Sequence, residues 1–167
     1  KEQGYDILAT GEMGIGNTTT SSAIASVLLE KRPEEVTGKG AGLSSDGMKR
    51  KIHAIETAIQ KHQPDKNDAV DVISKVGGFD IAGMTGLFLG GAALHMPVVA
   101  DGFISCVAAL CAIRMCPAVT DYVITSHKSK EPGTRMLLEA IHIPEFLYCE
   151  MCLGDGPGSV AIFPLLD

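Results

Sequence analysis

Glycine-rich stretches supply the residue types best suited to holding a phosphate. The first, at 11–16, follows a short apolar run and precedes a segment with apolar residues at helical spacing. Glycine lets a backbone approach a ligand closely, and a helix start presents unpaired N–H groups at the positive end of its dipole. This combination indicates an anion site, most often for phosphate. Neither a Walker nor a GxGxxG pattern is present, and a turn capped by a threonine would give the same spacing.

A second glycine stretch, at 37–42, is followed by Lys49, Arg50 and Lys51. A lysine beside a glycine loop can balance the charge of a phosphate. A solvated helix face would show the same pattern, so spacing alone leaves both interpretations open.

Three carboxylates stand where they could serve a sugar or a proton transfer. Glu12 and Asp101 would repel a phosphate but could accept hydrogen bonds from sugar hydroxyls, although Asp101 could equally be a turn residue. Asp155 lies between glycines in a third stretch, 154–158. A carboxylate on such a turn could act as a general base, or could belong to an ordinary Asp-Gly turn.

The elements that must position these loops alternate between strands and helices. Short apolar runs predict strands at 7–10, 97–100 and 121–125, and apolar spacing predicts helices between and after them. This order is typical of a mostly parallel sheet covered by helices, in one α/β domain over residues 1–167. Ligands bind such sheets at the carboxyl ends of the strands. The predicted helices are at 18–31, 47–61, 68–76, 80–94, 103–115 and 133–141, with another from 158.

Composition excludes several classes of function. The net charge of −6, the 5% aromatic content and the absence of tryptophan argue against a nucleic-acid or anionic-membrane surface. The most apolar stretch, 81–116, is interrupted by Asp101, so no membrane span is predicted. Five cysteines, an odd number, favour reduced thiols and a cytoplasmic location. Cys149 and Cys152 lack a second pair of matching spacing, so neither a metal nor a cofactor is expected.

Six motifs in order carry a resemblance over nearly the whole chain: GEMGIGNTT, TGKGAGL, VGGFDIAGMTGLFLGGA, PVVADGFISCVAALCA, SHKSKEPG and LGDGPGSVAIFPLL. The chain resembles the second half of the nicotinate-nucleotide–dimethylbenzimidazole phosphoribosyltransferase family. The resemblance implies a Rossmann-like three-layer fold, with the family's small helical domain largely missing. It also implies an enzyme of cobalamin lower-ligand synthesis. Such an enzyme moves ribose 5-phosphate from nicotinate mononucleotide to 5,6-dimethylbenzimidazole, giving α-ribazole 5′-phosphate and nicotinate.

The resemblance also implies roles for single residues. Asp155 stands where the family has its catalytic glutamate, and Pro157 and Thr134 also depart from the family pattern. Aspartate is shorter by one C–C bond of about 1.5 Å, and a misplacement of about 1 Å can cost on the order of 100-fold in rate. The residues implied to hold phosphate and ribose are Glu12, Gly14, Ile15, Gly16, Asn17, Thr18, Gly38, Gly40, Lys51, Asp101, Ser126 and His127.

Alternatives to this transferase remain open from the sequence. The chain could be a binding homologue without catalysis, or a phosphoribosyltransferase for another acceptor such as adenine or a phenol. The expected partners are small-molecule substrates and, as implied by the family, a second copy in a homodimer. The first residue is Lys1 and the last is Asp167, so we expect a piece of a longer polypeptide.

Overall fold

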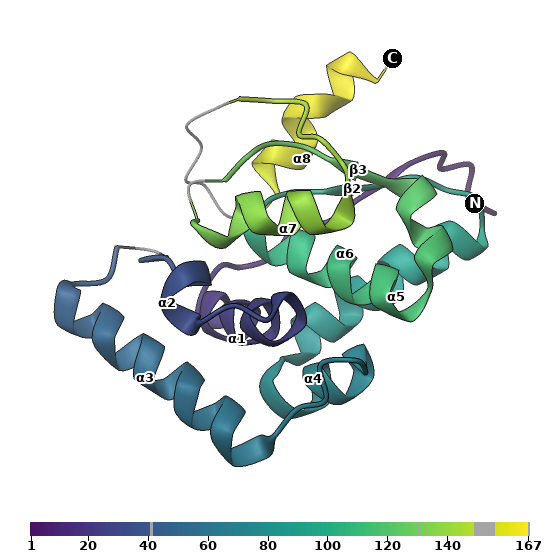
Figure 1. Cartoon of the computed structure of the whole chain (residues 1–167). Coiled ribbons are helices and arrows are strands. Elements are labelled where there is room, and N and C mark those ends of the chain that lie inside the picture. Colours follow the sequence, from purple (N-terminus) through teal and green to yellow (C-terminus); the bar gives the residue numbers. More distant parts are fainter. Residues whose placement is uncertain (41, 130, 149–155, 167) are drawn as a thin grey trace.

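The computed structural model describes residues 1–40, 42–129, 131–148 and 156–166 (Figure 1). Its sheet has strands β1 (Leu8–Ala9), β2 (Val98–Ala100) and β3 (Val123–Thr125), in the order β1-β2-β3. Both pairs are parallel, and Val98 lies opposite Leu8 on one side and Val123 on the other. Continuous apolar runs suit strands covered on both faces. The α/β class predicted from the sequence is confirmed.

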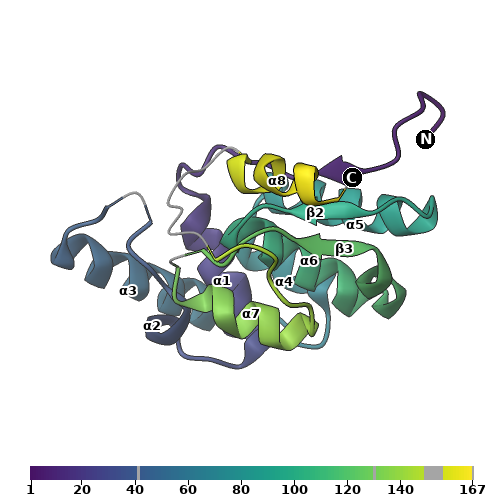
Figure 2. The same cartoon turned by 90° about the horizontal axis from the view of Figure 1, so that it is seen from above.

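Helices flank the strands. Helices α5, α6 and α7 lie below the strands in Figure 1, and α8 lies above them. Figure 2, seen from above, shows α3 projecting at one end of the molecule, beside α2. The helices are α1 (Asn17–Leu29), α2 (Pro33–Val36), α3 (Ser45–His62), α4 (Ala69–Val76), α5 (Phe79–Ala93), α6 (Phe103–Met115), α7 (Gly133–Ile141) and α8 (Pro157–Ile162). Two 3-10 segments are η1 (Pro117–Tyr122) and η2 (Phe163–Leu165).

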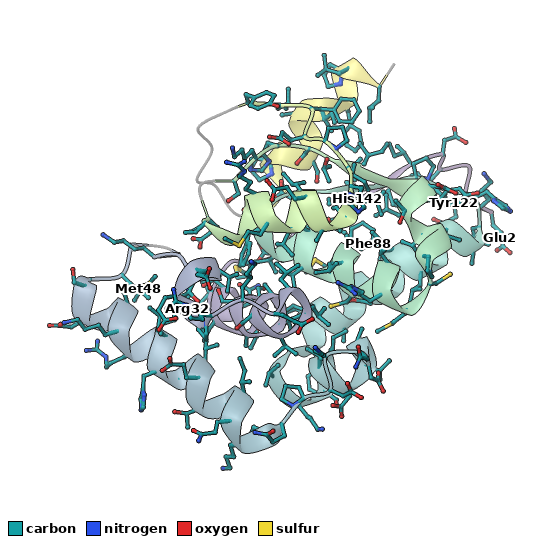
Figure 3. The ribbon with its side chains drawn as sticks, in the orientation of Figure 1. Glu2, Arg32, Met48, Phe88, Tyr122 and His142 are labelled. Atoms are coloured by element: carbon teal, nitrogen blue, oxygen red, sulfur yellow. The ribbon has the colours of Figure 1, made fainter. Side chains whose placement is uncertain are left out.

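Helix α6 forms the centre of the core. Its residues 103–112 are all buried, and it packs against α1, α5 and α7. Phe88 of α5 is fully buried in the same layer (Figure 3). Because burial removes apolar surface from water, this helical layer supplies most of the hydrophobic stabilisation. The core thereby fixes the strands whose ends carry the polar loops.

Proline accounts for two differences from the predicted elements. Pro33 ends the first predicted helix but also begins α2, since its fixed φ suits the first position of a helix. Pro117 begins η1 in the same way, so the strand predicted at 121–125 starts only at Val123.

Within the parts of the chain that the structure describes, no helix has both the length and the apolarity to cross a membrane.

Candidate active site

The carboxyl ends of the three strands bring polar residues together. Thr10, Asp101 and Ser126 directly follow β1, β2 and β3, and all three are buried. The Thr10 hydroxyl donates to the carbonyl of Val99 at 2.9 Å, and the Ser126 hydroxyl donates to the carbonyl of Asp101. These bonds fix the strand ends relative to one another at the edge where parallel sheets bind ligands.

Helix α8 packs directly over these strand ends. The Ser159 backbone N–H donates to Asp101 Oδ1 at 3.0 Å, and its hydroxyl donates to the Thr10 carbonyl at 3.1 Å. A Cβ atom at Gly158 would clash with the ring of His127 and would lie 2.7 Å from Asp101 Oδ1. Position 158 therefore has room only for glycine, and one carboxylate of the predicted site holds this helix in place.

The third glycine stretch meets the first glycine loop. Gly156 has φ +99°, and a Cβ there would lie 3.3 Å from the Cα of Gly11. The sequence's candidate base, Asp155, lies outside the described residues. The position that follows it is nonetheless at the carboxyl ends of the strands, on the same side as the first loop.

His127 is buried beside Ser126 and Asp101. Its Nδ1 lies 3.0 Å from the Ser126 hydroxyl oxygen. Since the single hydroxyl proton of Ser126 goes to the Asp101 carbonyl, Nδ1 must carry the proton and donate to Ser126. Burial lowers the pKa of His127, and the nearby charge of Asp101 opposes this shift. The lowered pKa favours the neutral ring, whose Nε2 can then accept a hydrogen bond.

The start of α1 is open to an anion. Gly14 and Gly16 have φ values of +72° and +83°, which side chains rarely adopt. Gly16 is the N-cap residue, so the alternative of a turn capped by a threonine is wrong. In the described structure no side chain caps this helix, and its first turn carries no acidic residue. The amides at its start remain available to a ligand.

The Glu12 side chain stabilises this loop through hydrogen bonds within it. Its Oε2 accepts hydrogen bonds from the Gly14 amide at 2.5 Å and from Asn17 Nδ2 at 2.6 Å. Asn17 Nδ2 also donates to Asp80 Oδ2 at 2.9 Å. The carboxylate expected to meet sugar hydroxyls therefore also shapes the loop. Asp80, at the start of α5, is a site neighbour that the sequence analysis missed.

Lys51 joins the two glycine loops. Its Nζ donates to Thr18 Oγ1 and to the carbonyl of Gly38, each at 3.0 Å. The side chain is buried, which lowers its pKa, while the charge of Glu131 opposes that shift. An ammonium group has three N–H donors, and two are accounted for here. The third N–H donor of Lys51 has no hydrogen-bond partner among the described residues.

Glu131 is a further member of the site that the sequence analysis missed. Its Oε1 accepts a hydrogen bond from the Gly40 amide at 3.0 Å. A Cβ at Gly38 would clash with Glu131 Oε2. Glu131 follows β3 in the SHKSKEPG motif, so this loop connects the strand ends to the second glycine loop.

The predicted residues thus form two adjoining clusters. Asp101, Ser126 and His127 lie under α8. Ile15 lies in the first glycine loop itself, and its side chain is 81% exposed. The cluster around the start of α1 comprises Glu12, Gly14, Gly16, Asn17, Thr18, Gly38, Gly40 and Lys51.

Comparisons with known proteins decide the family. Residues 1–167 match the family model described as Phosphoribosyltransferase. A nicotinate-nucleotide–dimethylbenzimidazole phosphoribosyltransferase from Acetivibrio thermocellus is 50% identical over 165 residues, covering 99% of this chain and 47% of the relative. The chain belongs to this family of phosphoribosyltransferases. The resemblance drawn from its motifs is confirmed.

Other members of the phosphoribosyltransferase family agree. A relative of the same name from Ruminiclostridium cellulolyticum is 50% identical over 167 residues, covering 100% of this chain and 47% of the relative. The crystal structure of CobT from Thermus thermophilus superposes with a TM-score of 0.93 at 38% identity, covering 99% of this chain and 49% of that one. The chain spans about half the length of the relatives it matches.

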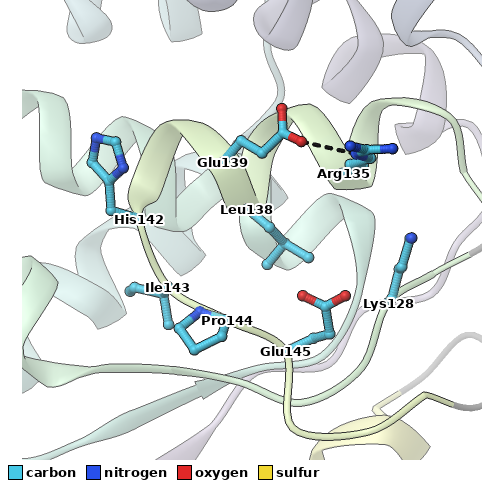
Figure 4. A pocket seen from close by; sticks show the side chains of 8 residues that line it. All are labelled: Lys128, Arg135, Leu138, Glu139, His142, Ile143, Pro144 and Glu145. Atoms are coloured by element: carbon cyan, nitrogen blue, oxygen red, sulfur yellow. Dashed lines mark hydrogen bonds and ion pairs between the residues drawn. The ribbon is translucent and has the colours of Figure 1, made fainter.

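A separate cavity of about 400 Å³ lies beside α7 (Figure 4). Arg135 and Glu139, one turn apart on α7, form an ion pair at its edge, with Nε 2.8 Å from Oε1. Its lining contains none of the phosphoribosyltransferase residues predicted above. The lining residues are Lys128, Arg135, Leu138, Glu139, His142, Ile143, Pro144 and Glu145.

Among the residues that the structure describes, no three histidine, cysteine, aspartate or glutamate side chains gather into a potential metal site. Cys149 and Cys152 lie outside the described residues.

Proposed function

We propose that the protein containing this chain transfers ribose 5-phosphate from nicotinate mononucleotide to 5,6-dimethylbenzimidazole, giving α-ribazole 5′-phosphate and nicotinate. One observation supports this proposal most. The uncapped start of α1 lies beside the Lys51 ammonium, and the turn after Asp155 lies against Gly11 of the same loop. A phosphate on the first feature would set its ribose toward the second.

The phosphate would bind through backbone amides and one cation. The first backbone N–H groups of α1 have no side-chain cap, and Lys51 adds a donor with a full charge. Hydrogen bonds to charged groups are worth about 1.5–3 kcal/mol each. Binding energy used at the phosphate, away from the reacting carbon, orients C1′ for the reaction.

The chemistry needs one proton acceptor. The pyridinium of nicotinate mononucleotide is a cationic leaving group, so a benzimidazole nitrogen can attack C1′ from the opposite face. The new C–N bond forms as the bond to nicotinate breaks, and the β-linked nucleotide becomes α-linked. The proton on the other ring nitrogen goes to the Asp155 carboxylate, which also stabilises the positive charge developing on the acceptor ring.

An apolar surface for the acceptor ring is already present in part. The side chains of Met13 and Ile15 are 70% and 81% exposed on the loop between β1 and α1. Large exposed apolar side chains beside a polar site are typical of ligand contact. The remainder of the acceptor pocket would come from the half of the relatives' length that this chain does not span.

The experiment that tests this proposal is an assay of the full-length protein. Nicotinate mononucleotide and 5,6-dimethylbenzimidazole are added together, and nicotinate release is followed by chromatography. Asp155→Asn should remove turnover while nicotinate mononucleotide still binds. Binding without nicotinate release would favour the non-catalytic homologue, and release only with adenine or a phenol would favour another acceptor.

A homodimer and a cytoplasmic location complete the proposal. Helix α5 exposes Gly83, Gly86 and Gly90, where an added Cβ would meet nothing within 4 Å, and Phe79 at its start is 97% exposed. An apolar groove of about 510 Å³ runs between α4 and α5. Such a surface suits a second copy, and a monomeric full-length protein in sedimentation experiments would contradict the homodimer.

The free buried thiols of Cys106 and Cys111 support the proposed cytoplasmic location, where thiols stay reduced.

A further inference from the structure

Lys51 lacks a bonded counter-ion although it is buried. Its two hydrogen bonds, to Thr18 Oγ1 and to the carbonyl of Gly38, are to neutral oxygens. Among the described residues no carboxylate lies within ion-pair distance of its Nζ. A buried charge that is not balanced destabilises the folded chain. Some nearby negative charge must therefore offset this ammonium when no ligand is bound.

Glu131 is the carboxylate that acts on Lys51. Its charge opposes the effect of burial on the ammonium, and its Oε1 takes the amide of Gly40. An added Cβ at Gly40 would lie 3.7 Å from Lys51 Nζ and 3.1 Å from Thr18 Oγ1, so this amide belongs to the same cradle as the lysine. Glu131 thus accepts the hydrogen bond of the amide of Gly40, a residue that the family resemblance assigns to phosphate binding.

The other carboxylate oxygen of Glu131, Oε2, has no hydrogen-bond partner among the described residues. Oε2 is buried and accepts no hydrogen bond in the described structure. An unsatisfied buried acceptor destabilises the folded chain, because it has lost its hydrogen bonds to water. The residue as a whole is only half-buried, so part of its side chain already faces solvent. The position of Glu131 beside Lys51 is therefore unfavourable for one of its two carboxylate oxygens, and a competing anion can displace it.

We propose that Glu131 is an internal anion that occupies the phosphate site of the free protein and is displaced when the substrate phosphate binds. One lysine cannot stabilise both a phosphate and a carboxylate in the same cradle, because the two anions repel each other. Glu131 therefore protects Lys51 in the absence of substrate and lowers the affinity of the site for a bare phosphate. This inference rests on the proposed phosphate site.

The test compares Glu131→Gln with the unchanged protein and with Glu56→Gln. Glutamine keeps an acceptor for the Gly40 amide and removes the charge. Glu56 is an exposed glutamate on α3. Glu56→Gln therefore changes the net charge as Glu131→Gln does, but away from the phosphate site. Inorganic phosphate binding is measured by calorimetry, and the melting temperature of each protein is measured with and without phosphate.

Glu131→Gln should bind inorganic phosphate at least about tenfold more tightly, since like charges placed together oppose binding. It should melt lower than the unchanged protein without phosphate and gain more from a fixed phosphate concentration. Glu56→Gln should change neither property. Unchanged or weaker phosphate binding in Glu131→Gln would overturn the inference, as would an equal gain in melting temperature for all three proteins.

The outcome also separates this inference from the proposed transferase. If phosphate affinity fails to rise but the full-length protein still releases nicotinate, only the role of Glu131 is lost. If phosphate affinity rises as expected and no acceptor gives nicotinate release, Glu131 keeps its role and the transferase proposal fails.

Discussion

Lys51 Nζ lies 3.0 Å from Thr18 Oγ1, which ties the second turn of α3 to the first turn of α1. The two residues are 33 positions apart in sequence. Their contact brings a full positive charge to the end of α1 whose dipole is already positive. An anion bound there meets the amides and the ammonium together.

Lys51→Met should weaken binding of nicotinate mononucleotide by roughly 10- to 100-fold, the loss expected for a charged hydrogen bond of about 1.5–3 kcal/mol. Calorimetry on the full-length protein measures this. Lys49→Met is the matched control, because the Lys49 side chain is 81% exposed. Equal affinity in both variants would remove Lys51 from the phosphate site.

Gly16→Ala should lower the free energy of unfolding by about 1–2 kcal/mol, because the left-handed conformation at φ +83° brings Cβ against the backbone. Gly83→Ala tests the opposite case. Gly83 lies within α5 with open space around it in the single chain, so alanine should stabilise a single chain by about 0.5–1 kcal/mol. Urea titrations of both variants give the values, and a stabilising Gly16→Ala would contradict the assigned turn.

Acid should destabilise the protein through His127. Its pKa in the folded chain is lowered by burial, whereas the unfolded value is about 6.5. Below about pH 6.5 the unfolded chain therefore takes up a proton that the folded chain does not. The free energy of unfolding falls as the pH decreases, until the folded pKa is passed, by at most about 1.4 kcal/mol per pH unit. His127→Asn should flatten this dependence between pH 5 and 7.5 in urea titrations at each pH, and parallel curves for the two proteins would be inconsistent with a buried neutral ring.

Asp155→Glu should raise the turnover number of the full-length enzyme, since it restores the reach of about 1.5 Å that aspartate lacks. The gain could approach 100-fold if distance alone limits the native residue. Steady-state rates of nicotinate release measure it, with the KM for nicotinate mononucleotide expected to stay within about twofold. A slower glutamate variant would mean that the turn containing Pro157 is already fitted to aspartate.

The local pattern of apolar residues predicts most helices and strands, but it does not predict which distant residues contact one another in the site. The strand and helix positions follow from apolar spacing and glycine, as in α6, whose predicted limits 103–115 are those observed. The short segments α2 and η1, which begin at Pro33 and Pro117, were not predicted because they are too short to show an apolar period. Asp80 and Glu131 were missed because their partners are 63 and 91 residues away. No short-range periodicity reports contacts over such separations.

The all-round burial of α6 has a consequence for engineering. The stretch least tolerant of substitution should be this helix, because any change of volume from Phe103 to Ala112 must be absorbed by neighbours on every side. Attempts to retarget the acceptor should therefore leave this helix intact. Variation belongs in the exposed tips of the β1–α1 loop, where Met13 and Ile15 can be exchanged without repacking the interior.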